Sequence, residues 1–245
     1  MDNTLYVTLS RQMTLRHELD IVANNVANAD TSGFKVESLM LATRPSAPAV
    51  TQGGPKPVKF VYDTGVARDF GQGSLHRTDN PTDVGIEGQG FFQVTTPDGP
   101  RYTRDGRFRL DDTGKLTTQS GLPLAGDGGG DIVIDPQKGP ITIATDGSIS
   151  QGSERVGKVG VVRFDSLSVL EKTGDNLFRN TSNQQPQPAA DVRVRQGMLE
   201  GSNVNTVSEI TRLLEVTRTY EQMAKIMDSA ADLSRRSVER MGRVQ

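Results

Sequence analysis

The spacing of apolar residues changes twice along this chain of 245 residues, and that change limits its fold more than any other feature. From Asn205 onward, apolar side chains recur at steps of three and four residues over about five heptads, which is typical of a coiled-coil helix. Residues 3–28 carry a shorter helical stripe. The positions expected to make helix contacts in an assembly are Leu5, Leu9, Leu19, Val22, Val26, Ile210, Leu213, Leu214, Tyr220, Met223, Met227 and Leu233.

Both helices have boundary signals. The first should stop in the turn-forming run that ends at Gly33, a residue that can adopt the left-handed conformation. Thr206 and Glu209 have the spacing of a capping box, which predicts the start of the second helix.

Three asparagines occupy the last turns of the first helix, where asparagine is a mediocre helix former. They are Asn24, Asn25 and Asn28. Either they fray the helix end, or their amides bond to backbone groups of the turn and of adjoining subunits and so set the helix register.

Between the stripes the sequence is typical of β-structure. Thr43–Lys59 contains four prolines and two glycines and predicts an extended linker. Short β-rich runs then alternate with Gly, Asp and Asn turns as far as a Pro- and Gln-rich break at 183–188, and Asp191–Arg195 could form one more strand.

These patterns predict an α+β chain in which paired N- and C-terminal coiled-coil helices are joined by extended linkers to a central all-β domain. The expected boundaries are 1–33 and 203–245 for the helical domain, 34–75 and 189–202 for the linkers, and 76–188 for the β domain. Because proline-rich breaks bound it, residues 76–188 should fold alone.

Composition excludes several classes of function. The 28 basic and 30 acidic residues are interspersed and give a net charge of -2, which argues against a nucleic-acid or anionic-membrane surface. Cysteine is absent, so neither disulfides nor thiolate chemistry is expected. Met1–Arg11 lacks the pattern of a secretory signal peptide, and no apolar run approaches the ~20 residues of a membrane span.

Residues that could carry chemistry form no recognised pattern. His17 and His76 are the only histidines and have no metal-site spacing. The run Gly126–Asp131 lacks the lysine of a phosphate loop and is better explained as a hairpin tip. Three aspartates at steps of four do not match a calcium loop, namely Asp127, Asp131 and Asp135. We therefore expect no catalysis, no cofactor and no metal.

Helical stripes that remain uncovered within one chain usually mark interaction sites, so we expect assembly with other copies or relatives. Two alternatives from other classes remain. One is a periplasmic cell-wall hydrolase carried on helical arms, and the other is a soluble binding module whose helices fold back on the β domain.

Four stretches resemble one known family. Ile21–Lys35 closely resembles the N-terminal signature of the flagellar basal-body rod and hook proteins, and Asp79–Val94, Arg101–Phe108 and Gln196–Asn205 resemble the same family. Thr82 and Gly85 depart from its pattern, where leucine and alanine are usual. The motif residues are Asn24, Asn25, Asn28, Gly33, Phe34, Gly88, Gly90, Phe91, Phe92, Asn203 and Asn205.

The resemblance implies an axial protein of the bacterial flagellum, placed in the rod that crosses the periplasm and exported by the flagellar type III apparatus without a cleaved signal. Its implied partners are copies of itself, FlgB, FlgC, FlgG and the export apparatus. Met1–Gln12 and Phe60–Gly73 resemble a proximal-rod subunit, and a distal-rod subunit is the alternative.

Overall fold

A computed structural model describes residues 2–45, 59–182 and 184–242. The chain divides into two compact units, which are described separately. Unit 1 comprises residues 1–27, 36–69 and 205–245, and unit 2 comprises residues 28–35 and 70–204. The division confirms an α+β chain with a helix near each end and a β-rich middle.

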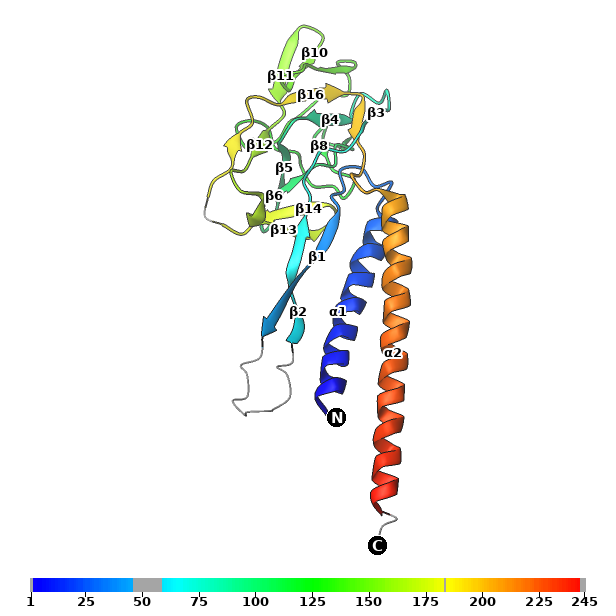
Figure 1. The fold of residues 1–245 in the computed structure, drawn as a ribbon. Helices are drawn as coiled ribbons and strands as arrows, with labels where there is room; N and C mark the ends of the chain where they lie inside the picture. The colour runs from blue at the N-terminus through cyan, green and yellow to red at the C-terminus, as the bar shows by residue number, and fades with distance from the viewer. Residues whose placement is uncertain (1, 46–58, 183, 243–245) are drawn as a thin grey trace. The chain divides into compact units, whose positions relative to one another are not determined.

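Unit 1 contains two helices that pack side by side (Figure 1). Helix α1 spans Asp2–Ala27 and α2 spans Thr206–Gly242. Their 26 and 37 residues correspond to about 39 and 56 Å at 1.5 Å per residue, so α2 is the longer by roughly three turns. Among the described residues, neither helix has a stretch long and apolar enough to cross a bilayer.

Two strands of unit 1 also pack on α1. Strand β1 (Glu37–Pro45) pairs antiparallel with β2 (Lys59–Arg68). Both lie in the segment 34–75, where we expected an extended linker. Its four prolines all lie between residues 45 and 57, and the flanks contain Leu, Val, Tyr and Thr residues, which favour strands. Most of the predicted Thr43–Lys59 linker lies outside the described residues.

The cap of α2 differs from the expected capping box. The side chain of Asn205 provides it, because its Oδ1 accepts a hydrogen bond from the Ser208 amide at 3.1 Å. Glu209 is buried and its carboxylate bonds to α1, so it does not reach back to the helix start. The helix begins one residue after its true cap, at Thr206.

Unit 2 is built from antiparallel strands (Figure 1). Its largest sheet has six strands in the order β13 (Leu170–Gly174), β14 (Leu177–Asn180), β6 (Gly99–Thr103), β5 (Phe91–Thr96), β12 (Val161–Arg163) and β15 (Gln187–Pro188). A three-stranded sheet has the order β11 (Glu154–Lys158), β10 (Ser148–Gln151) and β9 (Ile141–Ile143). A short 3-10 helix, η1, spans Leu167–Val169.

Three strand pairs complete unit 2: β4 (Val84–Glu87) with β16 (Arg193–Gln196), β3 (Leu75–Arg77) with β17 (Met198–Glu200), and β7 (Arg109–Leu110) with β8 (Leu116–Thr117). Strand β16 confirms a strand near Asp191–Arg195. Together with β17 it occupies residues 189–202, which we expected to be a linker. The two strands lie there because the open edges of β4 and β3 need partners.

The main core of unit 2 includes residues from both sides of the predicted boundary at 188. Val194 of β16 is 3% exposed and packs in the same cluster as Val84, Phe92 and Ile149. A smaller aromatic cluster contains Phe91, whose ring meets those of Phe70, Phe164 and Phe178 edge to face. The core therefore needs residues beyond 188.

A fragment of residues 28–204 should fold alone with a cooperative thermal transition, because it contains every strand of unit 2. A fragment of residues 76–188 should not, because it lacks β16 and β17 and leaves β4 unpaired. Circular dichroism of both fragments during heating tests the difference. An equally sharp transition at the same temperature in 76–188 would show that the two strands are dispensable.

Candidate functional site

A fully buried amide in unit 1 joins three elements. The side chain of Asn25, in α1, is 0% exposed. Its Nδ2 donates to the backbone oxygen of Glu37 in β1 at 2.7 Å and to Oε2 of Glu209 in α2 at 2.9 Å. Its Oδ1 accepts from the Glu37 amide at 3.0 Å. We call Asn25, Glu37 and Glu209 the asparagine centre.

The asparagine centre shows what one of the three predicted asparagines does. Asn25 bonds to backbone atoms, as one of the two interpretations required, but these atoms belong to β1 of the same chain. Asn28 follows the helix, and its Oδ1 accepts from the Thr31 hydroxyl at 3.1 Å. Asn24 is exposed. Whether any of them touches an adjoining subunit stays a prediction.

Ion pairs extend from this centre. The Glu37 carboxylate accepts from Nε of Arg68, in β2, at 2.7 Å. Further along the helix pair, Arg212 of α2 binds Glu18 of α1 at 2.9 Å. Because Asn25 and Glu18 both lie on α1 and bind residues in the first two turns of α2, they define one antiparallel register for the helices.

The predicted helix-contact residues divide between two environments. Val22 is buried, and the half-buried members are Leu19, Val26, Leu213, Tyr220, Met223 and Met227. The exposed members are Leu9, Ile210, Leu214 and Leu233. The side chain of Leu5 lies outside the described ones. The stripes therefore only partly cover each other.

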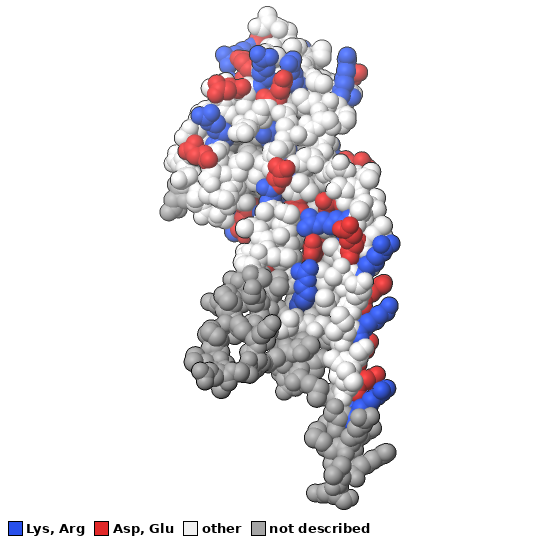
Figure 2. Space-filling view, in the orientation of Figure 1, with Lys and Arg blue, Asp and Glu red and all other residues white. Residues whose placement is uncertain are grey.

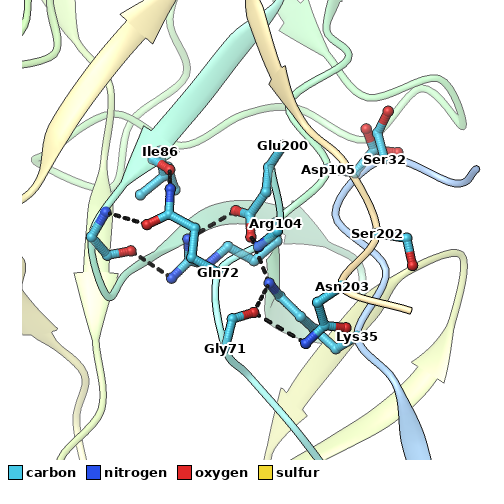
Figure 3. A network of polar contacts seen from close by, with 12 residues as sticks. Ser32, Lys35, Gly71, Gln72, Ile86, Arg104, Asp105, Glu200, Ser202 and Asn203 are labelled. Carbon is cyan, nitrogen blue, oxygen red and sulfur yellow. Dashed lines mark hydrogen bonds and ion pairs between the residues drawn. The ribbon is translucent and has the colours of Figure 1, made fainter. Parts of the chain in front are cut away.

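A buried carboxylate lies at the centre of a second network, in unit 2 (Figure 3). The side chains of Glu200, Lys35 and Arg104 are 0%, 0% and 3% exposed. Oε1 of Glu200 accepts from Lys35 Nζ at 2.5 Å and from the Gly73 amide at 2.9 Å. Oε2 accepts from Arg104 Nη1 at 3.0 Å. We call Glu200, Lys35 and Arg104 the glutamate centre.

The two cations of the glutamate centre also bind backbone oxygens. Lys35 Nζ donates to Gly71 at 2.8 Å, and Arg104 Nη2 donates to Gly88 at 2.8 Å. The Arg104 guanidinium lies 5.2 Å from the centre of the Phe91 ring. Burial lowers the pKa of Arg104, and the charge and hydrogen bond of Glu200 oppose that shift. Arginine nevertheless stays charged at physiological pH, so Arg104 is the cation of a buried ion pair with Glu200.

Glycines let the backbone segments around the glutamate centre approach closely. Gly33 has φ +70°, as expected, and a Cβ there would lie 2.4 Å from the backbone carbon of Arg104. A Cβ on Gly73 would lie 2.1 Å from the Gly201 oxygen. Only glycine fits at these two contacts. Because α1 ends at Ala27, Gly33 closes the following turn and not the helix itself.

Two further amide side chains, of Gln72 and the motif residue Asn203, bind backbone groups near this centre. Gln72 uses its amide to bridge two segments, since Nε2 donates to Ile86 O and Oε1 accepts from the Gly88 amide. Asn203 Nδ2 donates to Gly71 O at 3.1 Å. Of the other motif residues in unit 2, Gly88 is half-buried, and the buried ones are Phe34, Gly90, Phe91 and Phe92.

All four resembling stretches contribute to the glutamate centre or its immediate contacts. Lys35 ends the first stretch, Gly88 lies in the second, Arg104 in the third and Glu200 in the fourth. Sequence reasoning did not select Lys35, Arg104 or Glu200. One feature could have indicated these three residues: each is a charged residue inside a stretch that resembles the family.

The rejected calcium site is explained by ion pairing. Asp127 pairs with Lys158 at 3.3 Å and Asp131 with Lys115 at 2.7 Å, while Asp135 accepts from the Gln137 amide. The described residues contain no cluster of three potential metal ligands. On the face seen in Figure 2, basic and acidic side chains also alternate along α2.

Family models match three parts of the chain. They are described as "Flagella basal body rod protein" for residues 5–35, "Flagellar hook protein FlgE/F/G D1 domain" for residues 85–151, and "Flagellar basal body rod FlgEFG protein C-terminal" for residues 195–240.

Full-length relatives agree with these matches. The flagellar basal-body rod protein FlgF of Caulobacter vibrioides is 58% identical over 100% of both chains. The chain belongs to the flagellar basal-body rod protein family. The FlgF of Mesorhizobium japonicum is 36% identical over 99% of both chains. A FlgG of Buchnera aphidicola subsp. Acyrthosiphon pisum is 36% identical over 86% of this chain and 89% of the relative.

Family membership gives the chain a role as a structural subunit of the rod in the flagellar basal body. The FlgF of Caulobacter vibrioides is 58% identical and the FlgG relative 36%, so the distal-rod alternative, FlgG, is less well supported. The three matched regions contain the whole glutamate centre and, of the asparagine centre, Asn25 and Glu209 but not Glu37. Asn25 and Lys35 lie in the first, Arg104 in the second, and Glu200 and Glu209 in the third.

The two departures from the family pattern have local explanations. The Thr82 hydroxyl donates to Asn80 Oδ1 at 3.1 Å within a turn. An alanine methyl at Gly85 would lie 2.9 Å from Cδ2 of Leu75, so that side chain would have to move. Neither residue belongs to the asparagine or the glutamate centre.

Asn25→Asp should destabilise unit 1 by about 3 kcal/mol, because it removes two donated hydrogen bonds and places a second carboxylate against Glu209. The loss should shrink as the pH is lowered, since a protonated carboxyl can donate again. Chemical denaturation followed by the helical circular dichroism signal measures it.

Asn24→Asp is the matched control, because it makes the same change at the exposed neighbouring position. We expect it to alter stability by less than about 0.5 kcal/mol. Equal losses for the two variants would show that the asparagine centre has no special role.

Proposed function

We propose that this rod subunit belongs to the proximal rod and builds the axial drive shaft by packing its terminal helices against other subunits. The helices of one chain pair as a coiled coil, and further copies cover the rest of their apolar surface. In this role the protein transmits torque mechanically, without catalysis or a cofactor.

The distribution of exposed apolar side chains carries this proposal. Among the described residues, eleven large apolar side chains are exposed, and nine of them belong to unit 1. These nine are Leu9, Met13, Met40, Leu41, Val207, Ile210, Leu214, Ile226 and Leu233. Unit 2 contributes only Leu110 and Val133. Apolar surface that is concentrated in this way favours contacts with other chains.

Helix α2 has two distinct apolar faces. Leu213, Tyr220 and Met227 are half-buried, and buried Val216 lies between the first two. Val207, Ile210 and Leu214 are 77%, 43% and 54% exposed, and their mean direction lies about 120° around the helix axis from that of the first face. We call these three residues the outer stripe. One face is thus occupied within unit 1, and the outer stripe is available to a neighbour.

The partners we propose are copies of this chain and the rod proteins FlgB, FlgC and FlgG. The proposed location is the periplasmic part of the basal body, reached through the flagellar type III export apparatus without a cleaved signal peptide. Membership of the rod protein family supports both proposals.

The alternatives from other classes have less support. A soluble binding module would cover its helical stripes within the chain, but the outer stripe is exposed. A cell-wall hydrolase would need a reactive group in a cleft. A surface pocket of about 490 Å³ includes Gly126, Asp127, Asp131 and Lys158, and both aspartates are paired with lysines.

Val207→Asp/Leu214→Asp should leave the isolated chain folded, because both side chains are more than half exposed. The same change should block assembly, since it places charges in the proposed contact between subunits. Thermal denaturation of the purified chain, swimming in soft agar and recovery of the protein in isolated basal bodies test this prediction.

Leu110→Asp/Val133→Asp makes the matched change in unit 2, where the side chains are 36% and 51% exposed. Cells with this control should swim normally. Normal swimming of the outer-stripe variant at normal protein levels would exclude the proposed role of that face.

Leu213→Asp/Met227→Asp should act differently, because both residues lie on the half-buried face of α2. We expect unit 1 to lose several kcal/mol of stability and unit 2 to stay folded. Cells should then fail to build the flagellum beyond the rod. Two separate thermal transitions, of which only the helical one shifts, are the expected result.

A further inference from the structure

The chain passes between the two units at four places, namely 27/28, 35/36, 69/70 and 204/205. Three of these crossings lie within two residues of a side chain or carbonyl of the network in Figure 3. Lys35 precedes one, Gly71 follows another and Asn203 precedes the third. The first, second and third segments are residues 33–35, 71–74 and 200–203. They are distant in sequence, but they leave unit 2 from neighbouring positions.

These three segments are hydrogen-bonded to one another in every pairwise combination. Gly71 O accepts from both Lys35 Nζ and Asn203 Nδ2. The backbone N–H of Asn203 donates to Phe34 O at 3.4 Å. Glu200 strengthens this arrangement because its Oε1 binds Lys35 and the Gly73 amide together.

Backbone bonds place Glu200 itself between the segments. The Gly33 amide donates to the Glu200 carbonyl at 2.8 Å, and the Gly201 amide donates to Ser74 O at 2.8 Å. Glu200 thus bonds to the first segment through its backbone carbonyl. Its carboxylate bonds to Lys35 in the first segment and to the Gly73 amide in the second. Arg104 anchors that carboxylate to the strands of unit 2.

Burial makes the joint cooperative. The Lys35 ammonium donates to both Glu200 and the Gly71 oxygen, and losing such charge-assisted hydrogen bonds costs more than losing a neutral one. If Lys35 were lost, the Glu200 carboxylate would keep Arg104 and the Gly73 amide but no longer bind the first segment. A disturbance in one segment should therefore reach the others.

We propose that the glutamate centre is a clamp that joins these three segments into a single cooperative unit. Lys35, Arg104 and Glu200 are positioning residues, because they set the places from which the chain leaves unit 2. In a rod subunit, force that pulls on one segment is then shared by all three. This mechanical role rests on the proposed function, whereas the cooperative opening of the segments does not.

Hydrogen exchange of the full chain tests the clamp. In Lys35→Met, the amides of Gly33, Gly73 and Gly201 should all exchange faster by about tenfold or more, because each is bonded within the clamp. The Leu124 amide, which bonds to Leu116 O, reports whether unit 2 is still folded and should stay protected.

Lys115→Met is the control, since it removes a lysine from a pair with Asp131 that is 37% and 34% exposed. It should leave the three amides unchanged. Faster exchange at only one of the three amides in Lys35→Met, with Leu124 protected, would overturn the clamp and leave a local ion pair.

Asn203→Ala is a milder second variant, because it removes a neutral hydrogen bond to Gly71 and no charge. It covers the case in which Lys35→Met does not fold. The clamp predicts faster exchange at Gly33 and Gly73 as well as at Gly201, by a smaller factor. A change confined to Gly201 would contradict it.

Swimming under load tests the mechanical role. Cells with Asn203→Ala should swim normally in dilute medium and slow more than the parent strain as viscosity rises. Cooperative exchange together with a normal response to viscosity would keep the clamp and remove its role in torque. Failure of the outer-stripe prediction would instead contradict the proposed function.

Discussion

A carboxylate that is withdrawn from water needs compensation, and in unit 2 this requirement determines which segments meet. Glu200 obtains compensation from Lys35, Arg104 and the Gly73 amide, which come from three separate parts of the chain. Each donor must reach the same two oxygens, so the backbone segments that carry them must come close. That closeness explains the requirement for glycine at 33 and 73, where any Cβ would overlap a neighbouring backbone.

In unit 1 the buried polar group that must find partners is a neutral side chain. The Asn25 amide has two donors and one acceptor in use, and all three bonds lie in a fully buried position. A single polar residue in an apolar helix contact is known to specify register at some cost in stability. Here the amide also bonds both backbone groups of Glu37, so it determines where β1 lies along α1. One side chain therefore aligns two helices and a strand.

The fold class and the two helices could be predicted from the sequence because they depend on apolar spacing, which is a local property. A strand at Asp191–Arg195 was predicted and β16 confirms it, but the pairing of β16 with β4 and the whole of β17 were not predicted, since both depend on the edges of β4 and β3. Local spacing also could not distinguish Glu209 as a capping residue from Glu209 as a buried partner of Asn25. Likewise, Lys35, Arg104 and Glu200 look like ordinary surface charges until the fold brings them together.

The residues that fasten each unit internally and those that face outward differ in how much change they can tolerate. An apolar contact between helices accepts substitutions that conserve volume, whereas a buried charge network loses stability when any single partner is removed. The regions that the family models match hold Asn25, Lys35, Arg104 and Glu200, and the C-terminal region, residues 195–240, also holds the outer stripe. Because volume-conserving changes on an outward apolar face leave the buried networks intact, subunits that share one internal architecture can differ in that face. Differences of that kind would let related rod proteins recognise different neighbours while keeping the same two fastening centres.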